Sequence, residues 1–295
     1  MNKYLEILLN TPPRILLRLI KSGVRKNTQI GPYETISPCA FILSTGRVGT
    51  KTLAELFALD KHVYAYHEPL PKLFGLSRVC YDLTTTANAD VKVEAALVEA
   101  FLTARWDLLN CSLYSKRGYI ETSPQVTFAA PFILKVIPNA RFIHMVRNPQ
   151  PVVTSGVRRQ WYAGQINDQW RITPKPGDPF EALWEKMDQA EKILWLWAET
   201  NRWILDFSKT LGSGHCLLIH SEDLFAEKAD ILQALYAHLG LALPAERRIR
   251  HILNQRINAQ QYGDFDKSGD WNLNVNPELA SFVTRVAGSL GYQFP

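Results

Sequence analysis

A nine-residue segment near the start of the chain, residues 44–52, constrains the fold more than any other. It follows an apolar run at 40–43 that predicts a buried strand, and it precedes residues 53–57, which predict the first turns of a helix. A glycine-containing turn between a strand and a helix N-terminus gathers backbone N–H groups and favours negative charge. The segment therefore predicts a phosphate-binding loop in an α/β fold. Its members are Ser44, Thr45, Gly46, Arg47, Val48, Gly49, Thr50, Lys51 and Thr52.

The position of the lysine separates this loop from the common ATP-binding loop, in which Gly-Lys directly precedes Ser or Thr. Here Lys51 follows Thr50, and the second glycine lies two positions before the lysine. An NTPase also places an Asp at the end of another strand to hold Mg²⁺, whereas the apolar run at 141–146 ends in Arg147. A cation there suits a second anionic group. A P-loop kinase or NTPase and a non-catalytic nucleotide-binding protein remain as alternative functions.

Ser155 lies eight residues after Arg147, about two helical turns along. The loop and the Arg147–Ser155 segment together resemble the cofactor-binding pair of sulfotransferases that use 3′-phosphoadenosine 5′-phosphosulfate (PAPS). This resemblance extends from residue 38 to residue 290. It implies that the loop holds the 5′-phosphosulfate and that Arg147 and Ser155 hold the 3′-phosphate. It also places Arg47 beside the transferring group, as a catalytic residue.

The resemblance further implies that the catalytic base follows the second strand, where the sequence reads Tyr66-His67-Glu68-Pro69. Cytosolic phenol members use a His there, and carbohydrate members use a Glu. The Glu-Pro pair resembles the carbohydrate-type and bacterial branch more closely, so we favour Glu68, with His67 as the alternative. The implied reaction is in-line transfer of a sulfuryl group from PAPS to a hydroxyl or amine of a carbohydrate, lipid or small molecule. It releases 3′-phosphoadenosine 5′-phosphate and requires no metal.

A late segment, residues 267–272, resembles the loop that closes over the nucleotide in cytosolic members. The pair of basic residues expected before that loop falls on Asp264 and Phe265, which departs from the family pattern. Lys267 is the cation nearest to that position, and it is the candidate for a cofactor contact there.

The middle of the chain alternates strand-like and helix-like stretches, which predicts a three-layer α/β fold with a central, mostly parallel sheet, like that of P-loop NTPases. Ligands of such sheets bind at the carboxyl ends of the strands. Candidate residues at these ends are Ser44, His67, Glu121, Arg147 and His220. The predicted strands are 41–44, 63–67, 119–121, 142–146 and 216–220, and the predicted long helices are 91–109 and 181–207.

The acceptor cannot be read from the sequence, but two regions are expected to select it, residues 70–90 and 160–180. Trp161, Tyr162 and Trp170 flank a polar stretch that would form either a lid over the acceptor or part of the core. The segment at 121–124 would either line the acceptor site or begin a helix.

Length and charge limit the remaining possibilities. The chain has 295 residues and a formal net charge of +5, which suits anionic ligands but does not indicate nucleic acid binding. Residues 1–36 predict an amphipathic helical arm, and residues 37–295 predict a single sulfotransferase domain. The basic helix in the arm is compatible with peripheral membrane contact, or with packing on the domain or on a second subunit of a homodimer. No signal segment or membrane span is visible, so a cytoplasmic enzyme is expected.

Overall fold

A computed structural model describes residues 32–84, 91–255 and 275–294, and the described residues from Glu34 onward form one compact unit. Most of the predicted N-terminal arm lies outside the described residues, as does Lys267 with its loop. Within the described ranges, no helix is both long and apolar enough to cross a bilayer. The four cysteines, Cys39, Cys80, Cys111 and Cys216, form no disulfide.

The sheet has five parallel strands in the order β2-β3-β1-β4-β5. This confirms the predicted α/β class, and each predicted strand is present to within about two residues. Every residue of β1 is buried, which explains why the sequence shows an unbroken apolar run there. The strands are β1 (Cys39–Leu43), β2 (Val63–Tyr66), β3 (Gly118–Glu121), β4 (Arg141–Val146) and β5 (Cys216–His220).

The register brings the functional segments to one edge of the sheet. Phe41 on β1 pairs with Glu121 on β3 and with Phe142 on β4, while Tyr66 on β2 also pairs with Glu121. Because all strands run in the same direction, the segments that follow β1, β2, β3 and β4 leave the sheet at this common edge.

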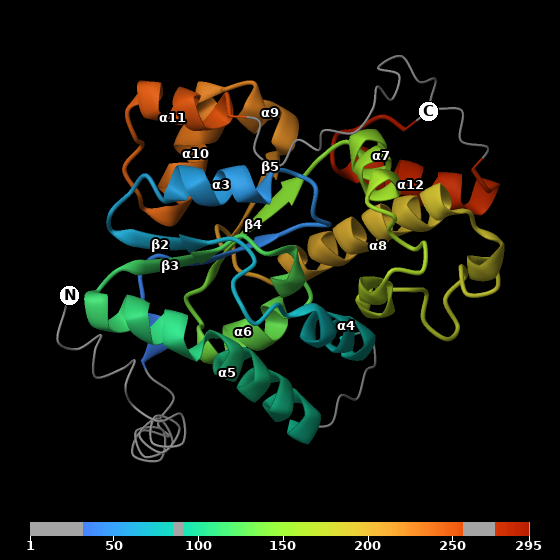
Figure 1. The fold of residues 1–295 in the computed structure, drawn as a ribbon, viewed down its shortest axis with the longest axis horizontal. Helices are drawn as coiled ribbons and strands as arrows, with labels where there is room; N and C mark the ends of the chain where they lie inside the picture. The colour runs from blue at the N-terminus through green and yellow to red at the C-terminus, as the bar shows by residue number, and fades with distance from the viewer. Residues whose placement is uncertain (1–31, 85–90, 256–274, 295) are drawn as a thin grey trace, which may run out of the picture. The chain divides into compact units, whose positions relative to one another are not determined.

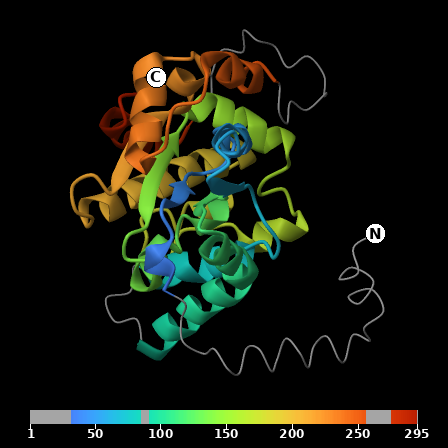
Figure 2. The same ribbon diagram turned by 90° about the vertical axis from the view of Figure 1, so that its left-hand side faces the viewer.

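Helices cover both faces of the sheet, as Figures 1 and 2 show. The blue and orange helices on one face are joined by a hydrogen bond from the Tyr236 hydroxyl to the Leu56 carbonyl oxygen at 2.9 Å. On the other face, the rings of Phe142 and Phe207 pack edge to face with their centroids 5.3 Å apart. The first face carries α3 (Thr50–Phe57), α10 (Ala229–Leu239) and α11 (Glu246–Leu253), and the second carries α5 (Val91–Ser115), α6 (Ala130–Val136) and α8 (Gln189–Lys209).

The remaining elements gather mainly beyond the carboxyl ends of the strands (Figure 1). α7 and α12 pack on α8, and α4 packs beside η3. They are α4 (Phe74–Leu83), α7 (Pro149–Arg158), α9 (Ser221–Phe225), α12 (Pro277–Ser289) and the short 3₁₀ helices η1 (Tyr33–Thr35), η2 (Pro124–Val126), η3 (Ile166–Trp170) and η4 (Trp184–Lys186).

The long helix predicted at 181–207 begins later than the apolar periodicity indicated. Asp188 caps the helix by accepting a hydrogen bond from the Glu191 backbone N–H at 2.8 Å, and the Glu191 carboxylate accepts the Asp188 N–H at 3.1 Å. This reciprocal capping box fixes the start of α8 at Gln189. The preceding residues form η4, and the prediction of helix there was wrong.

Candidate active site

The loop after β1 has a tightly wound backbone. Gly46, Arg47 and Gly49 all have positive φ angles of 82°, 61° and 100°. A Cβ atom at Gly49 would also come within 2.7 Å of the Phe225 ring, so this position requires glycine on two grounds. Arg47 adopts the left-handed region without being glycine, a conformation that proteins retain mostly at functional sites.

Hydrogen bonds fix the loop to its surroundings. The Ser44 N–H donates to the Thr127 hydroxyl at 3.0 Å, and that hydroxyl donates back to the Ser44 carbonyl oxygen at 3.1 Å. The Gly46 N–H donates to the Ser44 hydroxyl at 3.2 Å. On the other side, the Ser221 hydroxyl donates to the Val48 carbonyl oxygen at 2.6 Å. The loop is therefore held between η2 and the start of α9.

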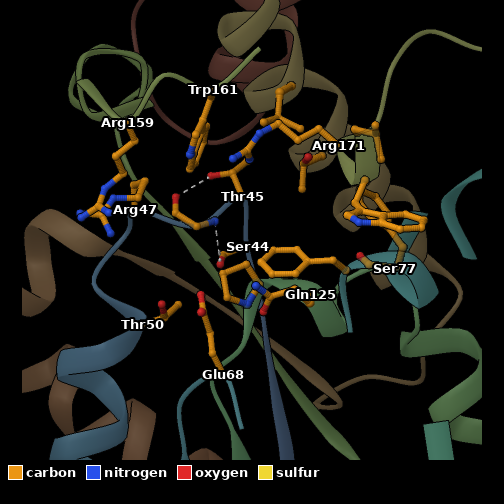
Figure 3. A pocket seen from close by; sticks show the side chains of 18 of the residues that line it. Ser44, Thr45, Arg47, Thr50, Glu68, Ser77, Gln125, Arg159, Trp161 and Arg171 are labelled. Atoms are coloured by element: carbon orange, nitrogen blue, oxygen red, sulfur yellow. Dashed lines mark hydrogen bonds between the residues drawn. The ribbon is translucent and has the colours of Figure 1, made fainter. Parts of the chain in front are cut away.

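A cavity of ≈ 280 Å³ opens above this loop. Figure 3 shows Arg47 and Arg159 on one side of the cavity, Ser77 and Arg171 on the other, and Glu68 at its base. Part of the predicted loop lines the cavity, and the rest of the loop does not. The loop residues in the lining are Ser44, Thr45, Gly46, Arg47 and Thr50, whereas Val48, Gly49, Lys51 and Thr52 lie outside the lining.

Positive charge is concentrated on the loop side of the cavity. The Arg147 guanidinium donates to the Arg47 carbonyl oxygen at 3.2 Å, and Arg47 Nε donates to the Ser155 hydroxyl at 2.9 Å. Burial, followed by repulsion from Arg159 and Arg147, lowers the pKa of Arg47 to about 10. Arg47 still carries its charge at neutral pH, so the cluster favours a bound anion.

Arg159 is the residue of this cluster that the sequence analysis missed. Its Nε atom is buried and has no hydrogen-bond partner among the described residues. It lies four positions after Ser155, a spacing that places both on one face of a helix. That spacing was the available signal, since Ser155 was already a candidate.

Arg147 and Ser155 lie behind Arg47 and are not part of the cavity lining. The Trp197 indole N–H donates to the Arg147 carbonyl oxygen at 2.9 Å and so holds the end of β4 against α8. Asn148 then caps α7 by accepting the Gln150 N–H at 3.0 Å. The structure thus brings both predicted residues to the cation cluster, with Ser155 bonded to Arg47.

His67 lines the cavity and has one ring nitrogen fixed. Its Nδ1 atom lies 3.2 Å from the Thr122 carbonyl oxygen and 3.1 Å from the Thr122 hydroxyl. A carbonyl oxygen only accepts, so Nδ1 carries the proton and Nε2 is left as the basic nitrogen. Burial lowers the pKa of His67, and the nearby Glu68 charge partly opposes this effect. The ring is therefore neutral at neutral pH.

Glu68 also lines the cavity, and its backbone is left-handed, with φ 47°. Its N–H donates to the Ser123 hydroxyl at 2.9 Å, and its carboxylate accepts from Lys72 at 2.8 Å. Burial alone would raise the pKa of Glu68. The hydrogen bond and charge of Lys72, assisted by His67 and Gln125, outweigh burial and hold this pKa below its ordinary value. Glu68 is therefore a carboxylate at neutral pH.

Glu121, the candidate at the end of β3, has a structural role instead. It is fully buried and accepts two hydrogen bonds from Arg105, each at 2.7 Å, and one from the Tyr119 hydroxyl at 2.6 Å. Arg105 also donates to the Pro71 carbonyl oxygen at 2.9 Å, which fixes the segment that follows Glu68. Pro124 is the member of the 121–124 segment that lines the cavity.

The other side of the cavity is built from the two regions expected to select the acceptor. Phe74 and Ser77 come from α4, while Trp170 and Arg171 come from the segment between α7 and α8, which also brings Trp161 to the cavity beside Gly46. His220, the remaining strand-end candidate, lies outside the cavity lining and approaches the Leu290 carbonyl oxygen, 2.7 Å away. Within the described ranges, no three His, Cys, Asp or Glu side chains come together as a metal site would require.

Comparison with known proteins identifies the family. The profile of a sulfotransferase family matches residues 38–245. The chain belongs to the sulfotransferase family. This result distinguishes it from the kinases and NTPases that a phosphate-binding loop alone would have allowed. A comparison with curated proteins gave no significant match.

Solved structures share the fold of this sulfotransferase. The sulfotransferase domain from the curacin biosynthetic pathway has a TM-score of 0.55 at 18% identity, covering 88% of this chain and 99% of that domain. The sulfotransferase domain from the Synechococcus PCC 7002 olefin synthase has a TM-score of 0.50 at 19% identity, covering 88% of this chain and 96% of that domain. At these identities the likeness concerns the fold.

Proposed function

We propose that this sulfotransferase transfers the sulfuryl group of PAPS to a hydroxyl or amine of a carbohydrate, lipid or small-molecule acceptor. The cation cluster is the observation that carries the proposal. Arg47, Arg147 and Arg159 lie close enough for the last two to lower the pKa of the first, and the Arg159 Nε atom has no hydrogen-bond partner in the part of the chain that the structure describes. Such a cluster beside a helix N-terminus fits a ligand with more than one anionic group.

The residues present suit the two ends of PAPS. The loop at 44–52 would hold the 5′-phosphosulfate through its N–H groups and through Arg47, and Arg159 faces the same side of the cavity (Figure 3). Arg147, which precedes α7, and Ser155, within α7, would hold the 3′-phosphate. Ser155 now accepts a hydrogen bond from Arg47, so it would exchange this partner when the phosphate binds.

Sulfuryl transfer needs a nucleophile aligned opposite the leaving phosphate, a base and a stabilising cation. When bound, PAPS supplies the sulfuryl group and the phosphate leaving group. Glu68 would accept the proton of the acceptor hydroxyl as the new oxygen–sulfur bond forms. Arg47 would stabilise the charge that grows on the bridging oxygen as 3′-phosphoadenosine 5′-phosphate departs.

Three observations favour Glu68 as the base. Its carboxylate is ionised at neutral pH, it lies at the base of the cavity, and its charge acts on Arg47 across the site. Lys72 would stay hydrogen-bonded to the carboxylate and orient it. His67 is the alternative, because its Nε2 atom is basic and the ring lines the same cavity.

Calorimetric titration with 3′-phosphoadenosine 5′-phosphate tests the proposal, together with mass spectrometry of acceptors incubated with PAPS in the presence of EDTA. We expect saturable binding and a sulfuryl group added to at least one acceptor. Loss of binding in Arg147→Ala would support the assignment of the phosphate site. The proposal fails if the protein binds ATP with Mg²⁺ more tightly than it binds the 3′-phosphorylated nucleotide.

A further inference from the structure

Part of the cavity lining is an apolar wall. Phe128 and Leu196 line it and are only 6% and 8% exposed. The Phe128 ring packs edge to face on Tyr81, with centroids 4.9 Å apart, and on Trp203, with centroids 5.0 Å apart. Phe74 extends the wall from α4. Because several elements hold these side chains, the wall is preformed and does not depend on one mobile loop.

Two polar side chains of the lining, Arg171 and Gln125, are held by neighbouring groups. Arg171 donates to the Asp168 carboxylate at 2.8 Å, and its guanidinium stacks on the Trp161 ring, 4.3 Å from the centroid. Gln125 forms a hydrogen bond with Glu68 that helps to lower the pKa of that carboxyl. The Arg171 Nε–H and the Gln125 amide are therefore engaged, whereas the terminal N–H groups of Arg171 can still donate to a polar atom of a ligand.

Thr200 is different. It lines the cavity from α8, one turn beyond Leu196, and it is 2% exposed. Its hydroxyl has no hydrogen-bond partner among the described residues. A buried hydroxyl without a partner is costly, so a ligand atom that bonds to it would gain the full benefit of the contact. Ser77 adds a further hydroxyl to the lining.

The size of the cavity limits what fits. Its ≈ 280 Å³ lies at the lower end of the roughly 300–1,000 Å³ common for ligand sites, and the sulfuryl donor takes part of that space. A sugar ring presents several hydroxyls, and each one buried against Phe74, Phe128 or Leu196 would lose its hydrogen bonds to water without replacement. An apolar acceptor body has no hydrogen bonds to water that it could lose there.

We infer that the acceptor is a small alcohol or phenol with a mainly apolar body, which lies against Phe74, Phe128 and Leu196 and presents one further polar atom to Thr200. This rests on the proposed sulfuryl transfer and narrows its acceptor class. The acceptor oxygen loses its proton to the base and forms the bond to sulfur, while the sulfur–oxygen bond to the departing phosphate breaks.

An acceptor panel tests the apolar wall. The kcat/KM for 1-propanol through 1-hexanol should rise about fourfold with each methylene, the factor for burying one CH₂ group. Saturation-transfer NMR on protein loaded with 3′-phosphoadenosine 5′-phosphate should detect 4-ethylphenol and not methyl glucoside. A flat alcohol series, or methyl glucoside displacing 4-ethylphenol, would overturn the inference.

A matched pair of acceptors tests Thr200. 4-Hydroxyacetophenone carries a carbonyl where 4-ethylphenol carries only hydrogen. Thr200→Val should reduce the ratio of kcat/KM for the ketone to that for 4-ethylphenol by about tenfold, the value of one buried hydrogen bond. Thr200→Ser keeps the hydroxyl and should preserve the ratio. An unchanged ratio in Thr200→Val would remove Thr200 from acceptor selection.

Different results would overturn the sulfuryl-transfer proposal and the acceptor inference. If 3′-phosphoadenosine 5′-phosphate does not bind in calorimetry, the sulfuryl-transfer proposal falls and the acceptor inference falls with it. If the nucleotide binds and the protein sulfates sugars in preference to apolar alcohols, sulfuryl transfer stands and only the acceptor inference is wrong.

Discussion

The Nε atom of Arg47 donates a hydrogen bond at 2.9 Å to the hydroxyl of Ser155, 108 residues further along the chain. This contact links the two segments that would hold opposite ends of PAPS, the loop after β1 and helix α7. On the proposed function, Arg47 would therefore lie between the two phosphate sites. One side chain would then join the reactive end and the 3′-phosphate end of the site.

Removing the Arg47 guanidinium should affect catalysis more than binding. We expect Arg47→Ala to lower kcat by about 10²–10³-fold, the range for losing one preorganised donor to a developing oxyanion. Arg47→Lys keeps the charge and should retain part of the activity. Steady-state kinetics with PAPS varied will measure both variants. A loss of affinity for 3′-phosphoadenosine 5′-phosphate with kcat unchanged would place Arg47 in binding alone.

Ser155→Ala should affect nucleotide binding more than catalysis. It removes a hydroxyl that would bond to a charged phosphate, so the nucleotide affinity should fall about tenfold or more. The kcat at saturating PAPS should change little, because Ser155 would already have exchanged Arg47 for the phosphate in the bound state. Calorimetry with nucleotides that carry and lack the 3′-phosphate will check the assignment. If Ser155→Ala weakens both equally, Ser155 does not contact that phosphate.

The pH dependence of kcat/KM will separate the two candidate bases. A base works when it is unprotonated, so activity is lost as the pH falls through its pKa. Lys72 and its neighbours hold the pKa of Glu68 below its ordinary value despite burial, so activity through Glu68 should persist down to about pH 5. Glu68→Gln should then lower turnover more than His67→Gln. A fall that sets in below about pH 6.5 at a higher pH than Glu68 allows, and that vanishes in His67→Gln, would assign the base to His67.

The buried pair of Arg105 and Glu121 should contribute strongly to stability. Their side chains are 1% and 0% exposed, so Glu121→Ala leaves an uncompensated buried charge. The free energy of unfolding should fall by about 3–5 kcal/mol. Asp206→Ala breaks two ion pairs at the surface, with Arg202 and with Lys209, and should cost only about 1 kcal/mol. Urea unfolding will compare Glu121→Ala with Asp206→Ala. Equal losses of unfolding free energy would contradict the role given to the buried pair.

His144 should make the protein less stable in mild acid. Burial lowers the pKa of His144 to about 4, with the Asn201 contact opposing this and His220 adding to it. The unfolded chain binds this proton near pH 6.5, so stability falls as the pH drops from 6.5 towards 4. The contribution of His144 to the free energy of unfolding should be about 2 kcal/mol smaller at pH 5 than at pH 7. Urea unfolding of His144→Gln should show a weaker pH dependence, and an unchanged dependence would refute this.

Much of the fold could be predicted because β1 and its loop carry strong local signals. An apolar run without polar interruption indicates a strand buried on both faces, and the turn after it needs glycine. The start of α8 was misplaced because apolar periodicity continues through Leu183 and Met187 into a segment that is not helical. The Asp188–Glu191 capping box was present in the sequence and outweighs that periodicity.

The site residues that directly follow a strand could be predicted from the sequence. Those that reach the site because distant segments pack together could not. Ser44, Arg47, His67 and Glu68 follow strands directly, so their convergence comes from the parallel topology. Thr200 could not be found this way, because a threonine within a buried helix looks like any other core residue until α4 and the η3 segment pack across from it. Glu121 shared the strand-end signal, but Arg105 from α5 occupies its carboxylate.

The crowded arginines have a kinetic consequence. Repulsion from Arg147 and Arg159 makes the nucleotide-free site electrostatically unfavourable. A substrate and a product that carry the same phosphates relieve this repulsion to a similar degree. On the proposed function, 3′-phosphoadenosine 5′-phosphate would therefore dissociate slowly. Its release, which added salt would favour, would limit the turnover rate more than the bond-breaking step does.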